Sequence, residues 1–286
     1  MLGKRVLIPL PDGHDVPVDL YIPEVSEEID AEIRRPAVII CPGGAYRFLS
    51  HRESEPVALD FAAHGFNAFV VWYRVTPFTW PKPQWDAAAA MQWVRTHAEE
   101  LYVHPGQIAL LGFSAGAHCA CSVAENWQNP DLWADAALLP EHIRPNALIL
   151  AYPVITAGEY AHRESLVHLS GTEDVSVHDA YSLEKHVTAA MPPTFLWHTW
   201  QDELVPVENS FLLASALRKN GVLTEMHIYP YGSHGSSLCR PETSGAVNPC
   251  LNLPDSANWT KDARRFLKSV FRQKDRENYH HFLSAS

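Results

Sequence analysis

Residues 112–116 read Gly112-Phe113-Ser114-Ala115-Gly116, a G-x-S-x-G pentapeptide. A mostly apolar run precedes it and a segment of small residues follows it, and these predict a buried strand and a helix. A serine between small residues at a strand-to-helix junction is typical of a nucleophile elbow, in which a tight turn exposes the hydroxyl at its tip. The pentapeptide alone leaves open an ordinary turn with the serine as a helix cap.

A serine nucleophile needs a base, an acid that orients the base, and donors for an oxyanion, because its hydroxyl is barely ionised at neutral pH. In a parallel sheet these groups lie on loops at the carboxyl ends of strands, in the chain order serine, acid, histidine. Asp202 follows one predicted strand and His234 follows the next. We therefore predict a Ser114–Asp202–His234 catalytic triad, with Glu203 as the rival acid.

An oxyanion hole requires backbone N–H groups on a loop that can approach the substrate closely. The residue after the nucleophile, Ala115, is expected to supply one donor. The Gly-Gly loop that follows an early strand is expected to supply more, from Gly44 and Ala45. Tyr46 would then form a wall of the site, where it either hydrogen-bonds the substrate or only packs. A plain Gly-Gly turn is the competing interpretation of this loop.

Strands that alternate with helices predict an α/β fold with a mainly parallel sheet and helices on both faces. The turn tripeptide Pro11-Asp12-Gly13 predicts a leading hairpin, and so an antiparallel N-terminal edge. A strong helix is expected from Asp86, at its start, to Leu101. The polar, poorly periodic stretch 159–193 is expected to be a small helical insertion or lid. Residues 1–286 are expected to form a single domain.

Composition excludes several classes of partner. A net charge of −11 argues against nucleic-acid and anionic-membrane partners, which demand basic patches. No long apolar stretch predicts a signal peptide or a membrane span. The five cysteines are irregularly spaced, which favours a reducing, cytoplasmic compartment over a disulfide framework. Cys119 and Cys121, beside His118, do not share a helix face, so we expect no metal site.

The chain resembles the α/β-hydrolase superfamily from about Ala37 to Phe271. It is most similar to the acetyl esterase/lipase group, which includes hormone-sensitive-lipase-like carboxylesterases and bacterial xylan and carbohydrate acetyl esterases. The matching segments are Pro42-Gly43-Gly44-Ala45-Tyr46, Val71-Trp72-Tyr73-Arg74-Val75-Thr76-Pro77, the helix from Asp86 to Ala98, Gly112–His118, Asp202 with Val205-Pro206, and Gly232-Ser233-His234-Gly235. The family's nucleophile, acid and base fall on Ser114, Asp202 and His234.

The resemblance implies hydrolysis of short-chain acyl esters without a metal or an organic cofactor, on a small-molecule substrate. Two departures stand out. Pro42 replaces a frequent histidine that supports the loop, and His118-Cys119 replaces a small pair on a helix, where we expect little effect. An acetylated sugar or xylo-oligosaccharide is the narrower substrate expectation. Trp72, Trp80, Trp85 and Trp200 could stack a sugar, although tryptophans near strand ends more often belong to the core.

Two other functions stay open from the sequence. One is a serine peptidase of the prolyl-oligopeptidase type, although such enzymes usually carry a further large domain. The other is a non-catalytic binding protein on a hydrolase scaffold, because a fold does not determine a function. Acyl length, the alcohol or sugar, and the choice between a monomer and a homo-oligomer are not encoded in any pattern that we can interpret.

Overall fold

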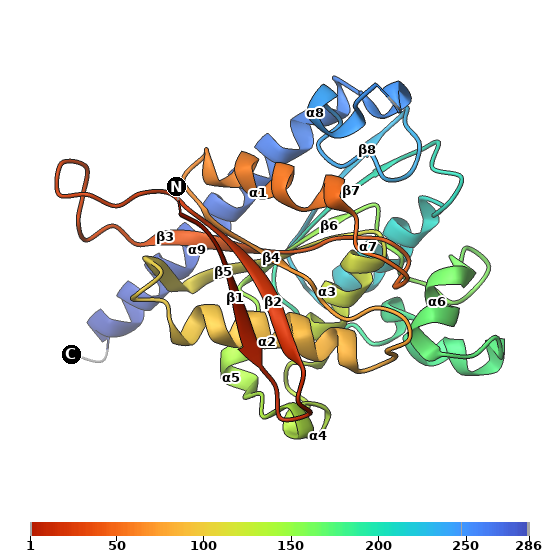
Figure 1. Cartoon of the computed structure of the whole chain (residues 1–286), viewed down its shortest axis with the longest axis horizontal. Coiled ribbons are helices and arrows are strands. Elements are labelled where there is room, and N and C mark those ends of the chain that lie inside the picture. The colour runs from red at the N-terminus through yellow and green to blue at the C-terminus, as the bar shows by residue number, and fades with distance from the viewer. Residues whose placement is uncertain (1, 247, 285–286) are drawn as a thin grey trace.

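An eight-stranded sheet in the order β1-β2-β4-β3-β5-β6-β7-β8 forms the centre of the computed structural model, which describes residues 2–246 and 248–284 (Figure 1). The strands are β1 (Leu2–Pro9), β2 (Asp15–Ile22), β3 (Arg35–Cys41), β4 (Asn67–Val71), β5 (Val103–Phe113), β6 (Ala147–Ala151), β7 (Thr194–Thr199) and β8 (Thr224–Tyr229). The six strands from β3 to β8 run parallel, whereas β1 and β2 are antiparallel to their neighbours. The predicted mainly parallel sheet with an antiparallel N-terminal edge is confirmed.

Helices cover both faces of the sheet, because the central strands are apolar throughout and each face must be buried. One face carries α1 (Glu55–Ala62) and α9 (Trp259–Ser284), and the other carries α2 (Lys82–Thr96), α3 (Ala115–Asn126) and α7 (Glu208–Lys219). The shorter helices are α4 (Pro130–Trp133), α5 (Pro140–Ile143), α6 (Arg163–Ser170), α8 (Pro241–Ser244) and the 3-10 turns η1 (His51–Glu53), η2 (Ala134–Ala136), η3 (Val175–Tyr181), η4 (Leu183–Lys185), η5 (Pro249–Leu251) and η6 (Ser256–Asn258).

The prediction that a helix begins at Asp86 and ends at Leu101 is wrong at both ends. Helix α2 begins at Lys82, four residues earlier, and ends at Thr96. A proline at 83 is tolerated because the first helical N–H groups have no partner within the helix. Asp86 is therefore not a cap: it lies in the first half of the helix, is fully buried, and forms an ion pair with Arg74 at 2.8 Å.

The 159–193 stretch contains α6, η3 and η4, so its predicted helical character is confirmed. It packs against loops at the carboxyl end of the sheet. The carbonyl of Leu169 accepts a hydrogen bond from the Trp80 N–H at 2.8 Å, and His168 Nδ1 donates to the Ala45 carbonyl at 2.9 Å. Its role as a lid stays a prediction.

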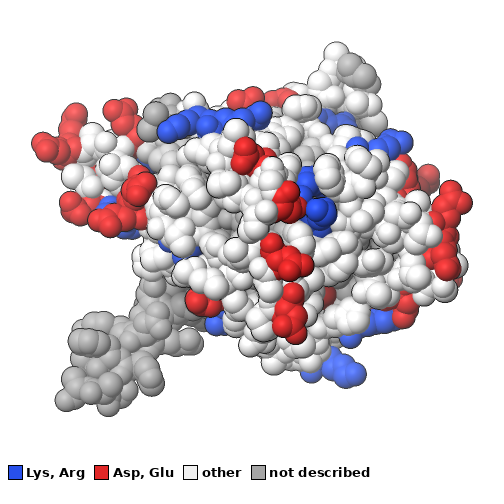
Figure 2. All heavy atoms as spheres, turned by 60° about the horizontal axis from the view of Figure 1, so that its bottom comes forward, with Lys and Arg blue, Asp and Glu red and all other residues white. Residues whose placement is uncertain are grey.

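Charges of both signs are scattered over the face in Figure 2, with acidic side chains gathered at the end where the 23–34 loop projects in Figure 1. That loop carries Glu24, Glu27, Glu28, Asp30 and Glu32. Among the described residues drawn on this face, no continuous basic area is visible. Within residues 2–246 and 248–284, no helix combines the length and the apolar character needed to cross a bilayer.

Candidate active site

Ser114 lies at the sharp turn between β5 and α3, with a φ of 52° and a ψ of −120°. The turn needs glycines on both sides because the backbone comes very close. A Cβ at Gly112 would lie 2.4 Å from the Gly116 carbonyl oxygen, and a Cβ at Gly116 would lie 2.2 Å from that of Cys41. The sharp strand-to-helix turn predicted from the pentapeptide is thus present, with the geometry that a nucleophile elbow requires.

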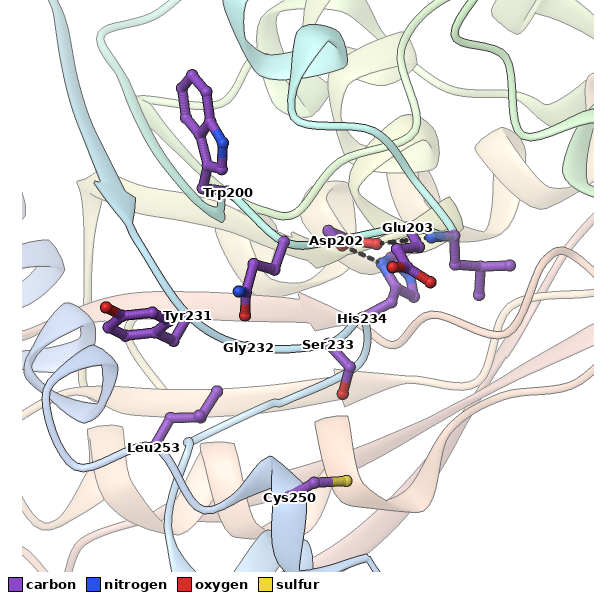
Figure 3. A pocket seen from close by; sticks show the side chains of 11 residues that line it. Trp200, Asp202, Glu203, Tyr231, Gly232, Ser233, His234, Cys250 and Leu253 are labelled. Carbon is purple, nitrogen blue, oxygen red and sulfur yellow. Dashed lines mark hydrogen bonds and ion pairs between the residues drawn. The ribbon is translucent and has the colours of Figure 1, made fainter.

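The structure brings Ser114, His234 and Asp202 together. His234 Nε2 lies 2.8 Å from Ser114 Oγ, and His234 Nδ1 lies 2.7 Å from Asp202 Oδ2. The carboxylate can only accept, so Nδ1 carries the hydrogen and Nε2 is free to accept from the serine hydroxyl. This is the tautomer that a general base needs. Figure 3 shows the His234 ring directed at the Asp202 carboxylate.

The Asp202 carboxylate is held by more than His234. Its Oδ1 accepts the backbone N–H groups of Leu204 at 3.1 Å and Val205 at 2.9 Å. Its Oδ2 lies 3.2 Å from Nε2 of a second histidine, His198, which is fully buried. That Nε2 also lies 2.9 Å from the Val205 carbonyl, so it must be the donor in both contacts. Nothing in the sequence pattern pointed to His198.

These contacts decide the ionisation of Asp202. Burial alone would raise the pKa of the carboxyl, but the hydrogen bonds from His198 and His234 outweigh it and hold the pKa well below its usual range. Asp202 therefore stays ionised through neutral and mildly acidic pH. An ionised acid keeps His234 in the tautomer described above and stabilises an imidazolium when one forms. Glu203, the rival acid, is exposed, and among the described residues no hydrogen bond or ion pair joins it to His234.

The predicted oxyanion loop lies directly opposite Ser114. A Cβ at Gly43 would lie 3.0 Å from the Ser114 Cβ, which shows how closely the loop approaches. Gly44 and Ala45 have φ angles of 131° and 56°, and both line the cavity that contains Ser114. Across the described part of the chain, the N–H groups of Gly44, Ala45 and Ala115 have no hydrogen-bond acceptor. These are the three donors expected from the sequence.

A buried glutamate that the sequence analysis missed ties this loop to the rest of the site. Glu53 Oε2 accepts the Gly43 N–H at 2.8 Å, and Oε1 accepts the Tyr152 hydroxyl at 2.7 Å. The Tyr152 oxygen in turn accepts the Ser237 N–H at 2.9 Å, and its ring stands edge-on to His234 at 5.0 Å. Burial and the nearby Glu53 raise the pKa of Tyr152 well above 10, so it remains a donor.

The prediction that Tyr46 forms a wall of the site is wrong. Its side chain is 1% exposed and turns into the interior, where the hydroxyl contacts His118 Nδ1 at 2.9 Å and Gln84 Nε2 at 3.2 Å. The packing alternative fits this position. His118, for which we expected little effect, connects this loop to the 159–193 stretch, because its Nε2 also donates to the Tyr181 carbonyl at 2.9 Å. Burial lowers the pKa of His118 to about 4, so the ring is neutral and its Nδ1 can accept the Tyr46 hydroxyl.

Ser114 opens into a cavity of about 270 Å³. Its walls come from the oxyanion loop, from Phe48 and Leu204, and from charged side chains that include Arg52 and Glu164. The 159–193 stretch contributes His162, whose Nδ1 lies 2.8 Å from the Ser165 hydroxyl. Burial and the nearby His234 lower the pKa of His162, which keeps its ring neutral. Among the described residues, no cluster of three metal-ligating side chains occurs.

The sequence of this chain is similar to those of known proteins. The BD-FAE family model matches residues 18–217. Endo-1,4-beta-xylanase B of Butyrivibrio fibrisolvens is 35% identical over 74% of this chain, and the acetylxylan esterase of Xylanibacter ruminicola is 31% identical over 70%. The chain spans only 34% and 40% of the length of these two curated relatives.

Solved structures agree along nearly the whole chain. An acetyl ester-xyloside bifunctional hydrolase from Caldicellulosiruptor lactoaceticus is 35% identical with a TM-score of 0.77, and the match covers 94% of this chain and 96% of that one. Carboxylesterase Cest-2923 from Lactobacillus plantarum is 26% identical with a TM-score of 0.82, covering 94% and 98%. With a matching family model over most of its length and these structural neighbours, the chain belongs to the BD-FAE family and has the α/β-hydrolase fold.

Proposed function

We propose that this protein is a serine carboxylesterase that hydrolyses short-chain acyl esters. The observation that carries the proposal is the continuous chain of contacts Ser114–His234–Asp202, at 2.8 and 2.7 Å, opposite backbone N–H groups that have no acceptor. Esterases among the similar proteins support it. No organic cofactor or metal is required by this chemistry.

In the first half of the reaction, Ser114 Oγ attacks the ester carbonyl while His234 Nε2 takes the hydroxyl proton. The carbonyl oxygen becomes an oxyanion and accepts the N–H groups of Gly44, Ala45 and Ala115. Because α3 begins at Ala115, the positive end of its helix dipole also faces this charge. Asp202 stabilises the imidazolium. His234 then gives the proton to the alcohol oxygen, and the alcohol leaves.

In the second half, His234 takes a proton from water, and the water attacks the acyl-serine carbonyl. The same three N–H groups hold the second oxyanion. Collapse of this intermediate breaks the bond to Ser114 Oγ, which recovers its proton from His234, and the carboxylic acid departs. The tight turn at Ser114 and the Glu53 contact to Gly43 keep nucleophile and donors in place, so neither has to reorganise between the two halves.

The cavity at Ser114 favours short acyl groups. Its volume is about 270 Å³, and charged side chains such as Arg52 and Glu164 form part of its lining. A long alkyl chain would desolvate these charges without pairing them, which is unfavourable. We expect kcat/KM to be at least about tenfold lower on p-nitrophenyl decanoate than on p-nitrophenyl acetate. A series of p-nitrophenyl esters from acetate to decanoate measures this, and a maximum at decanoate would contradict the short-chain assignment.

The narrower substrate that we propose is an acetyl group on a sugar or xylo-oligosaccharide. An acetylxylan esterase and an acetyl ester-xyloside hydrolase are among the similar proteins, which supports this choice. Release of acetate from acetylated xylo-oligosaccharides is the direct test. A fluorophosphonate probe separates an esterase from a non-catalytic binding protein, because only an activated serine forms the adduct. Amide substrates matched to these esters test for a peptidase, which would hydrolyse the amides faster than the esters.

The assignment of the acid can be tested with neighbouring carboxylates. We expect Asp202→Asn to lower kcat about 10⁴-fold, because the amide can donate to Nδ1 and so favours the wrong histidine tautomer. The matched control is Glu203→Gln, which changes an exposed side chain in the same loop and is expected to retain activity. Steady-state kinetics on p-nitrophenyl acetate decide between them. A larger loss for Glu203→Gln would make Glu203 the acid.

We infer a cytoplasmic location, which the cysteines support, because Cys41, Cys119, Cys121 and Cys239 are buried free thiols and Cys250 is an exposed one.

A further inference from the structure

A cavity larger than the serine pocket lies on the other side of His234. It has a volume of about 980 Å³ and is formed by the loops that follow β7 and β8 together with the 250–253 segment (Figure 3). Only Leu204 and His234 line both cavities. The groove therefore continues the active site in one direction, and His234 marks the boundary.

Two aromatic residues line this groove, and their side chains are largely exposed. Trp200 is 63% exposed and Tyr231 is 65% exposed, whereas Trp133, Trp197 and Trp259 are fully buried. Trp200 is thus not a core residue, contrary to the usual expectation for a tryptophan near a strand end. Figure 3 shows both rings on the part of the groove away from the His234 imidazole. Large exposed aromatic surfaces beside an active site are typical of binding sites.

The backbone beneath these rings is well fixed. The Trp200 N–H donates to the Tyr229 carbonyl at 2.7 Å, and the Thr199 hydroxyl donates to the Gly232 carbonyl at 2.8 Å. These bonds join the loop after β7 to the loop after β8. At Gly232 the approach is so close that a Cβ would lie 2.9 Å from Thr199 Cγ2. The two rings are consequently presented by a rigid platform, which lowers the entropic cost of binding.

The reaction itself indicates which part of the substrate this groove would receive. His234 must hand its proton to the alcohol oxygen, so the alcohol has to leave from the His234 side of Ser114. The acyl group, in contrast, lies among the oxyanion donors and the walls of the smaller cavity. A groove that begins at His234 and leads away from Ser114 is therefore on the alcohol side.

The lining of the groove selects among alcohols. No lysine or arginine occurs among its described lining residues, and Asp202 and Glu203 contribute negative charge, so an anionic alcohol is disfavoured. Gln201, Glu203 and Ser233 supply donors and acceptors between apolar surfaces. Flat rings combined with hydrogen-bonding groups suit a molecule with apolar faces and a polar rim. A pyranose ring has this character, whereas an alkyl chain would leave the polar groups unpaired.

We propose that Trp200 and Tyr231 form an alcohol-side subsite that binds the pyranose rings of a neutral oligosaccharide ester. This inference rests on the proposed esterase function and deepens it. It assigns to these two residues a preference for oligomeric over small esters. It also requires the site to bind an oligosaccharide that carries no ester at all, because the rings contact sugar faces and not the acyl group.

The kinetic test compares two substrates. We expect Trp200→Ala and Tyr231→Ala each to lower kcat/KM on acetylated xylo-oligosaccharides about 3- to 10-fold, mainly through KM, since stacking on one aromatic ring contributes about that factor. On p-nitrophenyl acetate, whose alcohol is too small to span the groove, both variants are expected to keep wild-type kcat/KM. Tyr102→Ala is the control, because this aromatic is 36% exposed and directly precedes β5, at the amino end of the parallel strands, whereas the groove lies at their carboxyl end.

Binding measured without turnover separates this proposal from the proposed function. We expect unacetylated xylohexaose to bind wild type in calorimetry and to bind Trp200→Ala more weakly. A protein that binds xylohexaose but hydrolyses no ester would contradict the esterase assignment and retain the subsite. The subsite would be overturned if the ring variants lost activity equally on both substrates, or if their kinetics on both were unchanged. It would also be overturned if they lost as much activity on 2-naphthyl acetate as on the xylo-oligosaccharides, because the groove would then accept any flat apolar alcohol.

Discussion

Ser114→Ala is expected to lower kcat on p-nitrophenyl acetate by a factor on the order of 10⁴ to 10⁶, the range found when a triad nucleophile is removed. The hydroxyl is the attacking group, and His234 Nε2 is the partner that loses its bond, so no other side chain can replace it. The fold is expected to be unaffected, because alanine also fits the space beside Gly112 and Gly116. Steady-state kinetics and thermal melting measure the two effects separately.

The matched control is Ser122→Ala, which removes a hydroxyl from α3, eight residues after Ser114. Ser122 is buried, and in the described chain its Oγ has no hydrogen-bond partner, so this change is expected to leave both kcat and Tm close to wild type. Full activity of Ser114→Ala would show that hydrolysis proceeds at another group. Labelling by a fluorophosphonate should disappear in Ser114→Ala and persist in Ser122→Ala.

Arg74→Met is expected to destabilise the protein by about 3 to 5 kcal/mol, the cost of leaving a buried charge without its partner. The Asp86 carboxylate is fully buried and contacts Arg74 Nη2 at 2.8 Å, while Arg74 Nη1 reaches Asp12 at 2.6 Å. Burial raises the pKa of Asp86 against the pull of Arg74, and loss of Arg74 would raise it further. A carboxyl whose folded-state pKa exceeds its unfolded value gains stability as the pH falls. The difference in unfolding free energy between wild type and Arg74→Met should therefore shrink as the pH falls from about 8 to about 5.

Urea unfolding at several pH values measures this prediction. Arg5→Met is the control, because it removes the same side chain from an exposed ion pair with Asp19, where we expect a loss of no more than about 1 kcal/mol. The double variant Arg74→Met/Asp86→Asn should recover part of the loss, since the amide carries no charge and its oxygen can still accept the backbone N–H of residue 74. A loss of unfolding free energy that is the same at every pH would mean that lost packing of the Arg74 side chain, and not the unpaired Asp86 charge, destabilises the variant.

The order of elements and the sheet direction could be predicted from sequence because strands buried on both faces are read as short apolar runs. Helix ends were harder. Asp86 looks like a helix cap in sequence, because an aspartate after a proline-rich loop is a common start signal. Its real role depends on Arg74, which lies twelve residues earlier on another segment. No local pattern encodes that pairing.

The triad residues were predictable because each occupies a loop whose place is set by topology. Their contacts, short enough for proton transfer, are as the prediction required, although their catalytic roles await the variants above. What could not be predicted is which way Tyr46 turns, and that Glu53, His118 and His198 support the site. These side chains act through tertiary hydrogen bonds between distant segments, so their types carry no signal of their own in one sequence.

The Glu53 carboxylate has a consequence for recombination between members of this family. It joins the oxyanion loop, through Gly43, to the end of β6, through Tyr152, and Tyr152 in turn holds the segment beyond the histidine loop at Ser237. Three loops that are far apart in the chain thus depend on one another. Moving the 42–48 loop of this chain into a recipient scaffold that lacks a carboxylate at position 53 would leave the Gly43 N–H without its acceptor. Chimaeras should inherit all three segments from one parent.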